Sequence, residues 1–258
     1  MFGFKSKKVK FSFVILTWNR YKFLDLCLNS LTKSISSPDL CEILVLDNGS
    51  TDKTEETALK YSSVTYKKLK KNFGLNSYKQ LFRMSKGEYI VIVDDDVIEF
   101  PENIDTIFEK YMSNFSDFGY LALNVIQNEF TNGAKPGPEM YTLVSRNDLV
   151  IEEGPTGGWC SCMRKSEYKK IRWKFIFTDL SMKKGEYGAL TRQLKKRLGL
   201  RNGIIRDHTC FHASGQHYTK LFGHLDREIE KYAMVGMTRF VEIYQQEKNK
   251  DSEKVDNP

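Results

Sequence analysis

Short apolar runs separated by amphipathic stretches dominate the first part of the chain. The runs are nearly continuous, which is typical of strands buried on both faces, and the stretches between them repeat apolar side chains at helical spacing. Strands are expected at 11–16, 42–46, 64–67 and 89–93, and helices at 21–33, 50–61 and 75–85. This alternation predicts an α/β fold with a mostly parallel central sheet.

The second part of the chain gives weaker signals. The expected elements are a helix at 102–115, a strand at 120–125, a helix at 187–198 and a strand within 204–212. Clusters of glycine and proline at 128–139 and glycines at 154–158 indicate loops. One long or two short amphipathic helices are expected over 218–246, followed by a polar, frayed end.

Polar motifs directly follow three of the expected strands. They are Thr17 to Arg20, Asp47 to Asp52 and Asp94 to Asp96. Ligands of parallel α/β sheets bind beyond the carboxyl ends of the strands. One crevice at that edge of the sheet is therefore expected to collect all three motifs.

The run Asp94-Asp95-Asp96 is the strongest chemical feature. Three adjacent carboxylates at the end of a buried strand repel one another unless a cation neutralises them. Carboxylate oxygens suit hard cations such as Mg²⁺ or Mn²⁺, which commonly bind phosphate groups as well. A solvated acidic turn is the alternative. The apolar run before it disfavours that interpretation, because a buried strand fixes where the carboxylates point.

The other two motifs each have a structural and a functional interpretation. Asp47 to Asp52 is either a tight turn with a helix cap or a set of polar groups that hydrogen-bond a nucleobase. Trp18 is either a core residue or an aromatic ring that stacks on such a base. Their common position at strand ends favours the functional interpretation.

Four segments together resemble the family 2 glycosyltransferases. They are LTWNR (16–20), LDNGSTD (46–52), KNFG (71–74) and KGEYIVIVDDD (86–96), where the family commonly has PTYNR, VDDGSTD, NxG and GEYIxFLDxD. The resemblance implies a nucleotide-binding, Rossmann-like domain of the GT-A type with a helical C-terminal segment. We accordingly assign 1–125 to the donor-binding half of the domain, 126–217 to its acceptor-binding and catalytic half, and 218–258 to the helical segment.

The resemblance also implies roles for residues of these motifs. Trp18 takes the place of the family's Tyr that stacks on the donor base, and Asn48 replaces an Asp that bonds the base. Asp94 is expected near the ribose, and Asp96 on an Mn²⁺ or Mg²⁺ ion beneath the diphosphate. The full set expected to bind the donor is Thr17, Trp18, Arg20, Asp47, Asn48, Asn72, Asp94 and Asp95.

Catalytic and acceptor-binding residues are expected in the second half. The family's acidic pair before a helix best matches Gly185-Glu186-Tyr187, so Glu186 is the expected catalytic base, with Asp179 as the alternative. The segment His212-Ala213-Ser214-Gly215 is similar to the family's late H-x-x-G, and this resemblance implies that His212 is a further metal ligand. Gly158 and Trp159 either line the acceptor side or form a turn beside a core tryptophan.

The implied reaction is direct displacement at the anomeric carbon of a nucleotide sugar, expected to be a UDP-sugar, with inversion of configuration. Three other classes fit the sequence less well. A nucleotidyltransferase on a similar fold would need an early Gly-rich phosphate loop, and a Rossmann oxidoreductase would need G-x-G-x-x-G after the first strand. A non-catalytic nucleic-acid-binding protein would leave the three aspartates unexplained.

Positive charge is concentrated at 160–206. The whole chain has a formal net charge of +7, whereas this segment has 14 basic and 3 acidic residues, a net charge of +11. An anionic acceptor is therefore expected: a modified base of phage DNA, a lipid-linked glycan or a polysaccharide. Its expected contacts are Lys195, Lys196 and Arg197, on the solvent side of a helix. A solvated basic face without a partner is the alternative, and with it a neutral glycan or a protein side chain as the acceptor.

The remaining composition indicates the compartment. The 5 cysteines are odd in number and lack zinc-site spacing, which indicates reduced thiols. No window reaches the ~18 apolar residues of a membrane-spanning helix, and no apolar signal core precedes the N-terminal lysines. We expect a cytoplasmic protein, either free or peripheral at a membrane; the sequence does not predict its oligomeric state.

Overall fold

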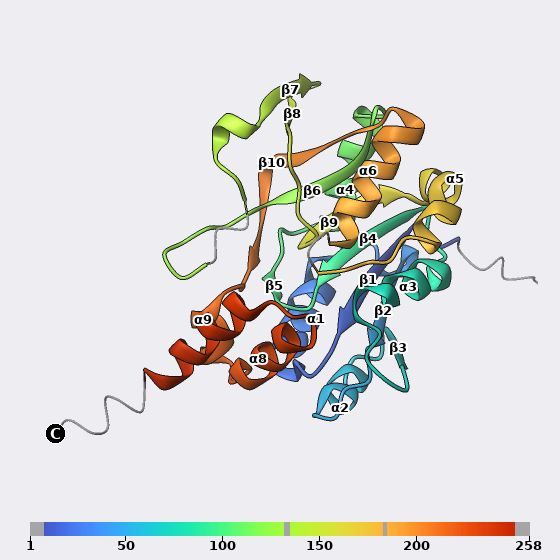
Figure 1. Cartoon of the computed structure of the whole chain (residues 1–258). Helices are drawn as coiled ribbons and strands as arrows, with labels where there is room; N and C mark the ends of the chain where they lie inside the picture. Colours follow the sequence, from blue (N-terminus) through green and yellow to red (C-terminus); the bar gives the residue numbers. More distant parts are fainter. Residues whose placement is uncertain (1–7, 132–134, 183–184, 251–258) are drawn as a thin grey trace, which may run out of the picture.

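The computed structural model describes residues 8–131, 135–182 and 185–250. It has one central sheet with helices on both faces and further helices beyond one end of the strands (Figure 1). The strands are β1 (Phe11–Thr17), β2 (Cys41–Asp47), β3 (Val64–Lys68), β4 (Tyr89–Asp94), β5 (Val97–Glu99), β6 (Phe118–Val125), β7 (Thr142–Arg146), β8 (Leu149–Glu153), β9 (Cys160–Arg164) and β10 (Arg201–His212). The α-helices are α1 (Tyr21–Ser34), α2 (Thr54–Leu59), α3 (Tyr78–Met84), α4 (Ile104–Asn114), α5 (Lys165–Ile176), α6 (Glu186–Leu198), α7 (Gln216–Leu221), α8 (Leu225–Met234) and α9 (Thr238–Asn249). Short 3₁₀ turns are η1 (Pro38–Leu40), η2 (Gly74–Ser77) and η3 (Pro138–Met140).

The sheet is mixed rather than mostly parallel. Its order is β3-β2-β1-β4-β9-β6-β10-β8-β7, with β5 paired to β10. The first four strands in this order, β3, β2, β1 and β4, run parallel to one another, as the alternating pattern predicts. β9 lies antiparallel between β4 and β6, and β8 is antiparallel to β7 and β10. The strands that follow residue 140 therefore introduce the antiparallel pairs that make the sheet mixed.

Two elements next to each other, β9 and α5, were not predicted from the sequence. β9 (CSCMR) lacks a run of branched apolar residues, yet it is buried in the middle of the sheet. Its Ser161 hydroxyl is satisfied by a 2.5 Å hydrogen bond with the hydroxyl of Tyr120. In α5, Tyr168, Ile171 and Phe175 form the buried face, but the many lysines and arginines between them mask the helical period.

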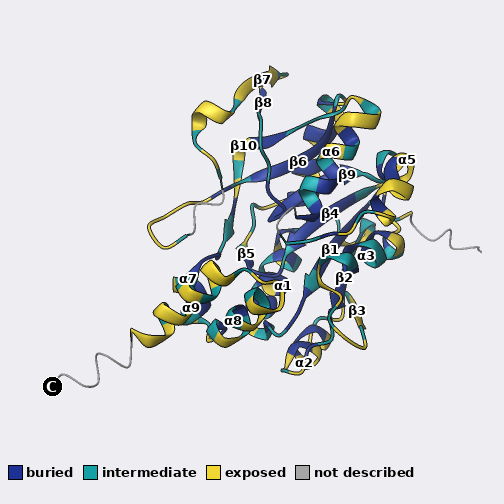
Figure 2. Cartoon of the chain, viewed as in Figure 1, coloured by how far each residue is buried: buried dark blue, intermediate teal, exposed yellow. Residues whose placement is uncertain are grey.

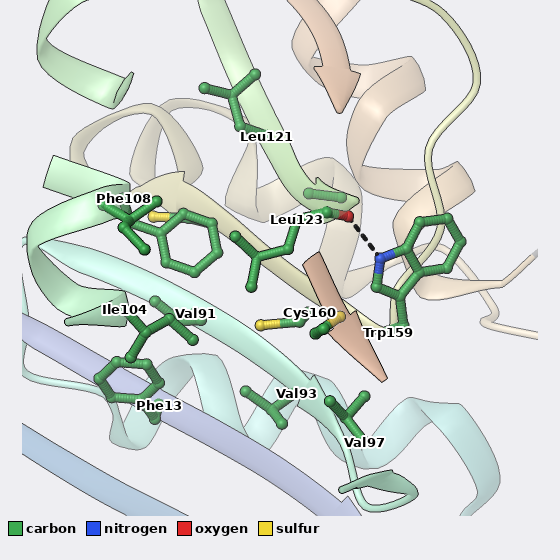
Figure 3. Packing of buried hydrophobic residues seen from close by; sticks show 14 of the residues in the cluster. Phe13, Val91, Val93, Val97, Ile104, Phe108, Leu121, Leu123, Trp159 and Cys160 are labelled. Atoms are coloured by element: carbon green, nitrogen blue, oxygen red, sulfur yellow. Dashed lines mark hydrogen bonds between the residues drawn. The ribbon is translucent and has the colours of Figure 1, made fainter. Parts of the chain in front are cut away.

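Alternate residues of the central strands pack into two different hydrophobic cores. Phe13 and Val91 belong to the core on the α1 and α4 side, whereas Val14 and Ile90 belong to the core under α3, α5 and α6. Figure 3 shows part of the first core, where Phe108 of α4 packs near strand residues. Figure 2 shows the inner strands buried between partly exposed helices. Burial on both faces accounts for the continuous apolar runs of the sequence.

The C-terminal segment forms three helices, α7, α8 and α9, where one or two were expected. Gly223 and Gly236 follow α7 and α8 with φ of 73° and 67°. A glycine in this left-handed conformation ends a helix at little cost, so the pair divides the segment. Tyr218 and Phe222 of this segment pack on Phe23 of α1, which anchors it at the carboxyl ends of the strands.

Two expectations from composition can be compared with the structure. The five cysteines form no disulfide within the described part of the chain. Among the described helices, none combines the length and the apolar character needed to cross a membrane.

Candidate functional site

A cavity of about 450 Å³ lies at the carboxyl ends of β1 and β4. The end of β10, the N-terminus of α6 and one side of α8 complete its wall. This position agrees with the rule for ligand sites in α/β sheets. The residues expected to be functional from the sequence that line it are Thr17, Trp18, Arg20, Asn48, Asn72, Asp94, Asp95, Asp96, Gly158, Glu186 and His212.

Local backbone geometry joins the loops after β1 and β2. Asn19 has a positive φ of 51°, and its backbone N–H donates a 2.8 Å hydrogen bond to the hydroxyl of Ser50. The Asn19 side-chain oxygen in turn accepts a 2.7 Å bond from the N–H of Thr51. Gly49 has φ of 86°, and a Cβ there would lie 3.0 Å from the backbone of Lys71. The sequence Asn48-Gly49-Ser50 therefore allows the loops after β1, β2 and β3 to approach one another closely.

Asp47 and Asn48 hold these loops. Asp47 is fully buried and does not line the cavity in the described structure; it accepts 2.7 and 2.6 Å hydrogen bonds from the Ser50 N–H and the Tyr66 hydroxyl. Asn48 donates to Asn72 and to the Gly74 carbonyl, and its oxygen accepts from the Phe73 N–H and the Ser77 hydroxyl. The expected donor contact of Asp47 is therefore corrected to a structural role, and the Asn48 side chain is already fully engaged.

Arg20 and Thr17 orient the carboxylates after β4. The Arg20 guanidinium donates 2.7 and 2.6 Å hydrogen bonds to Asp95 and Asp96, and the Thr17 hydroxyl donates a 2.7 Å bond to Asp95. All of these groups are buried. Arg20 thus neutralises part of the repulsion between the two aspartates. Arg20 also lines the cavity, so its expected contact with the sugar donor stays a prediction beside this positioning of the aspartates.

Asp94, Asp96 and His212 form a group suited to a divalent cation. One ligand atom from each lies within 4.8 Å of the others. His212 Nε2 is 3.0 Å from Asp96 Oδ1 and 3.8 Å from Asp94 Oδ2, and its buried Nδ1 has no hydrogen-bond partner among the described residues. Two carboxylates and an imidazole suit Mn²⁺, and the carboxylates alone suit Mg²⁺. The donor set therefore fits the metal expected from the sequence.

The three side chains of this group influence one another's protonation. Burial raises the pKa of Asp94 to about 6, although His212 acts in the opposite direction. Burial also opposes ionisation of Asp96, but Arg20 and His212 outweigh it and hold the pKa of Asp96 well below its usual value. The carboxylate of Asp96 outweighs the desolvation of His212, so the pKa of His212 is raised. Of the two carboxyl groups in this set, Asp96 thus has the lower pKa and is the one that stays ionised.

Glu186 is a further buried carboxyl group of the cavity wall, at the N-terminus of α6. Burial, followed by the charge of Asp94, raises the pKa of Glu186 to about 8. Gly158 makes room for it, because a Cβ at that position would lie 2.5 Å from Glu186 Oε1. A group whose pKa lies near the working pH can both accept and release a proton, so burial makes Glu186 a candidate for acid–base chemistry.

The alternative base, Asp179, is placed elsewhere. Its carboxylate is exposed and accepts a 2.9 Å hydrogen bond from the side-chain amide of Asn76. It is absent from the described wall of the cavity. The geometry therefore favours Glu186 over Asp179.

Trp159, one of the expected acceptor contacts, requires correction because it serves the core. Trp159 is 3% exposed, and its indole N–H donates a 2.8 Å hydrogen bond to the Leu123 carbonyl within the core (Figure 3). The neighbouring Gly158 alone reaches the cavity wall. Lys195, Lys196 and Arg197 are exposed as expected, but they occupy the last turn of α6, whereas Glu186 begins the helix. At about 1.5 Å per residue this is more than two helical turns away.

Charged residues of α8 complete the cavity and were missed by sequence reasoning. Arg227, Glu228 and Lys231 line it, and Glu228 forms ion pairs with both cations. Arg227 also donates a 2.8 Å hydrogen bond to the Trp18 carbonyl and lies 5.1 Å from the Trp18 ring centroid. The spacing of Arg227 and Lys231 is a weak signal that both share one helix face.

The mixed sheet and the cavity at its strand ends define an α/β domain of the GT-A type. Residues 12–172, more than half of the chain, match the sequence profile of glycosyl transferase family 2, and the chain belongs to that family. It is 29% identical over 111 residues to an uncharacterised glycosyltransferase of Mycoplasma genitalium, an alignment that covers 40% of this chain and 37% of that protein.

Solved structures share the fold. A structure of S. aureus TarS (1–349) in complex with UDP-GlcNAc has a TM-score of 0.61 and 19% identity, over 82% of this chain and 61% of that one. The mannosyltransferase PcManGT of Pyrobaculum calidifontis, in complex with GDP-Man and Mn²⁺, has a TM-score of 0.60 and 16% identity, over 88% and 61%. The chain thus spans about three fifths of the length of these structures.

Proposed function

We propose that the protein transfers a sugar from a UDP-sugar to an acceptor hydroxyl, with inversion at the anomeric carbon. The observation that carries this proposal is a single cavity that combines the Asp94, Asp96 and His212 group with the buried Glu186. Family membership supports glycosyl transfer. The likeness to structures that hold UDP-GlcNAc or GDP-Man is consistent with a nucleotide-sugar donor.

Asp94, Asp96 and His212 would hold a divalent cation, Mn²⁺ or Mg²⁺. The bound ion would supply Lewis-acid charge to the diphosphate leaving group. Arg20 keeps Asp96 in place for this purpose through its 2.6 Å hydrogen bond. Arg227 and Lys231 add positive charge to the same cavity, where a diphosphate would be partly desolvated.

Glu186 accepts the proton of the acceptor hydroxyl. The acceptor oxygen then forms a bond to the anomeric carbon while the bond from that carbon to the diphosphate oxygen breaks. The electron pair leaves with the nucleoside diphosphate. Attack from the face opposite the leaving group inverts the configuration. The backbone N–H groups at the N-terminus of α6 act against burial and favour the carboxylate form of Glu186, which accepts the proton.

The direct test is a hydrolysis screen of nucleotide sugars in the presence of Mn²⁺. It identifies the donor without knowledge of the acceptor. We expect release of UDP from at least one UDP-sugar, and none after denaturation of the protein. Absence of hydrolysis and of binding with every nucleotide sugar would contradict the proposal.

The acceptor is proposed to be anionic: modified DNA of the phage type, a lipid-linked glycan or a polysaccharide. The excess of basic residues at 160–206 supports this. A cytoplasmic enzyme, free or peripheral at a membrane, could meet each of these acceptors. The nucleic-acid-binding alternative would give tight, salt-sensitive DNA binding without metal, and the nucleotidyltransferase alternative would release pyrophosphate from a nucleoside triphosphate.

Replacement of Trp18 by alanine is expected to raise the Michaelis constant for the donor more than it lowers turnover. Trp18 lines the cavity and is proposed to stack on the base, far from the reacting carbon. Stacking of a base on an aromatic ring contributes roughly 1–3 kcal/mol. Steady-state kinetics with the donor identified above would measure both constants. Unchanged donor affinity in correctly folded protein would show that Trp18 serves the core.

Replacement of Lys231 by methionine is expected to weaken UDP binding. Loss of a hydrogen bond to a charged group typically costs about 1.5–3 kcal/mol, which is roughly ten- to 150-fold in affinity. Competitive inhibition by free UDP measures the effect. Lys248→Met on α9, where the side chain is 52% exposed, is the matched control. Equal inhibition constants in the two variants would exclude a diphosphate contact for Lys231.

A further inference from the structure

A second cavity, of about 720 Å³, lies between α3 and α5, and η2 contributes to its wall as well as to the wall of the first cavity, named here the donor cavity. Five basic side chains line this α3–α5 groove, and no carboxylate is among its described lining residues. The five are Lys79, Arg83, Lys165, Lys169 and Arg172. The groove therefore has an uncompensated positive charge.

Large apolar side chains stand exposed at the same place. Trp173, Ile176 and Phe177 of the α5 end are 61%, 38% and 80% exposed, and Phe73, across the groove, is 49% exposed. The buried face of α5 is already filled by other side chains, so the core does not require these residues. Exposed apolar side chains that gather beside basic ones mark an interaction surface.

We propose that the α3–α5 groove and the end of α5 form a docking surface for a membrane that contains anionic lipids. Tryptophan and phenylalanine favour the interfacial region of a bilayer, and lysine and arginine are attracted to anionic headgroups. Ile176 and Phe177 offer apolar surface that a hydrated polyanion would leave in water. A lipid surface fits both the charge and the apolar character.

The position of this surface gives docking a consequence for the donor cavity. The η2 segment contributes to both cavities: Gly74 and Leu75 line the donor cavity, whereas Asn76 and Ser77 line the groove. A membrane bound at the groove would contact η2, which also contributes to the wall of the donor cavity. Docking itself does not depend on glycosyl transfer, so the two proposals can fail separately.

The full chain supplies its own probe for the test. Of its 3 tryptophans, Trp18 and Trp159 are 8% and 3% exposed, so Trp173 dominates any change in solvent exposure. We expect a blue shift of tryptophan fluorescence and co-sedimentation with vesicles of phosphatidylcholine and phosphatidylglycerol, and neither with phosphatidylcholine alone. In Trp173→Phe the blue shift should vanish while co-sedimentation persists.

Two pairs of variants separate this surface from general basic charge. Lys169→Glu with Arg172→Glu is expected to lower the vesicle partition coefficient about tenfold or more. The matched control is Lys33→Glu with Lys110→Glu, two exposed residues on α1 and α4, which cover the other face of the sheet. Equal losses in the two double variants would overturn the proposal.

A pair of single variants tests how much the exposed apolar side chains contribute to vesicle binding. Phe177→Ser should weaken vesicle binding, whereas Leu59→Ser, at a residue of α2 that is 64% exposed, should not. Absence of vesicle binding at low salt would also overturn the proposal. So would binding of single-stranded DNA that exceeds vesicle binding and depends on Trp173, because the surface would then serve base stacking.

Discussion

Replacement of Asp96 by alanine, or removal of divalent cations with EDTA, is expected to abolish sugar transfer. Asp96 is buried, bonded by Arg20 and His212, and its pKa is held well below the usual value, so it presents a carboxylate at neutral pH. Charge stabilisation of a leaving group by a metal ion is worth several kcal/mol. Since about 1.4 kcal/mol corresponds to a tenfold change in rate, the loss should be about a thousandfold or more.

A second variant and a metal add-back distinguish a loss of metal binding from a loss of folding. Asp96→Asn keeps a hydrogen-bond acceptor for Arg20 but lacks the negative charge, so it tests the charge alone. Addition of Mn²⁺ after EDTA treatment should restore the transfer activity of the wild-type protein. It should not restore activity in either Asp96 variant. Asp226→Ala, at a carboxylate of α8 that is 79% exposed, should behave as wild type. Full activity in EDTA would exclude a metal-dependent reaction.

Replacement of Glu186 by glutamine is expected to remove most turnover and to leave donor binding intact. Glutamine keeps the shape of the side chain beside Gly158, but it cannot accept a proton at neutral pH. General-base catalysis contributes about 10²–10⁴-fold to rate, and the expected loss lies in this range. Single-turnover kinetics with a saturating donor measure the chemical step, and UDP inhibition measures donor binding.

Asp179→Asn is the matched control for Glu186, because Asp179 was the alternative base and its carboxylate is exposed outside the cavity. We expect near-normal turnover in that variant. The thermal midpoint of unfolding should be compared as well, since the buried Glu186 carboxyl group lies at a helix N-terminus. Normal turnover in Glu186→Gln with a large loss in Asp179→Asn would transfer the role of base to Asp179.

The first half of the fold could be predicted because its signals are local. β1, β2 and β4 are buried on both faces, so each reads as an apolar run, and a polar motif follows where each strand leaves the core. β9 could not be predicted in this way. Its place between β4 and β6 is filled by small side chains such as Cys160 and Ser161, which carry no strand signal of their own.

The candidate site shows the same division. The sequence pointed to Asp94, Asp96 and His212, but it could not show that His212, 116 residues from Asp96, lies within 3.0 Å of it. The sequence also could not show that Trp159 packs in the hydrophobic core. A tryptophan after a turn has the same local sequence whether its indole faces a ligand or bonds a carbonyl, and only packing decides between them.

The sequence by itself determined the buried strands, the polar motifs at their ends and the family to which they belong, because each depends on residues close together in the chain. The tertiary structure decided which of those polar groups remain free to contact a ligand and which are already bonded within the protein. It placed α8 against the cavity, assigned Arg20 to the aspartates, and used Asn48 to hold a loop. It also buried Glu186 deeply enough to raise its pKa to about 8. Burial and hydrogen-bond partners depend on residues distant in the chain, and these set the chemistry of a side chain.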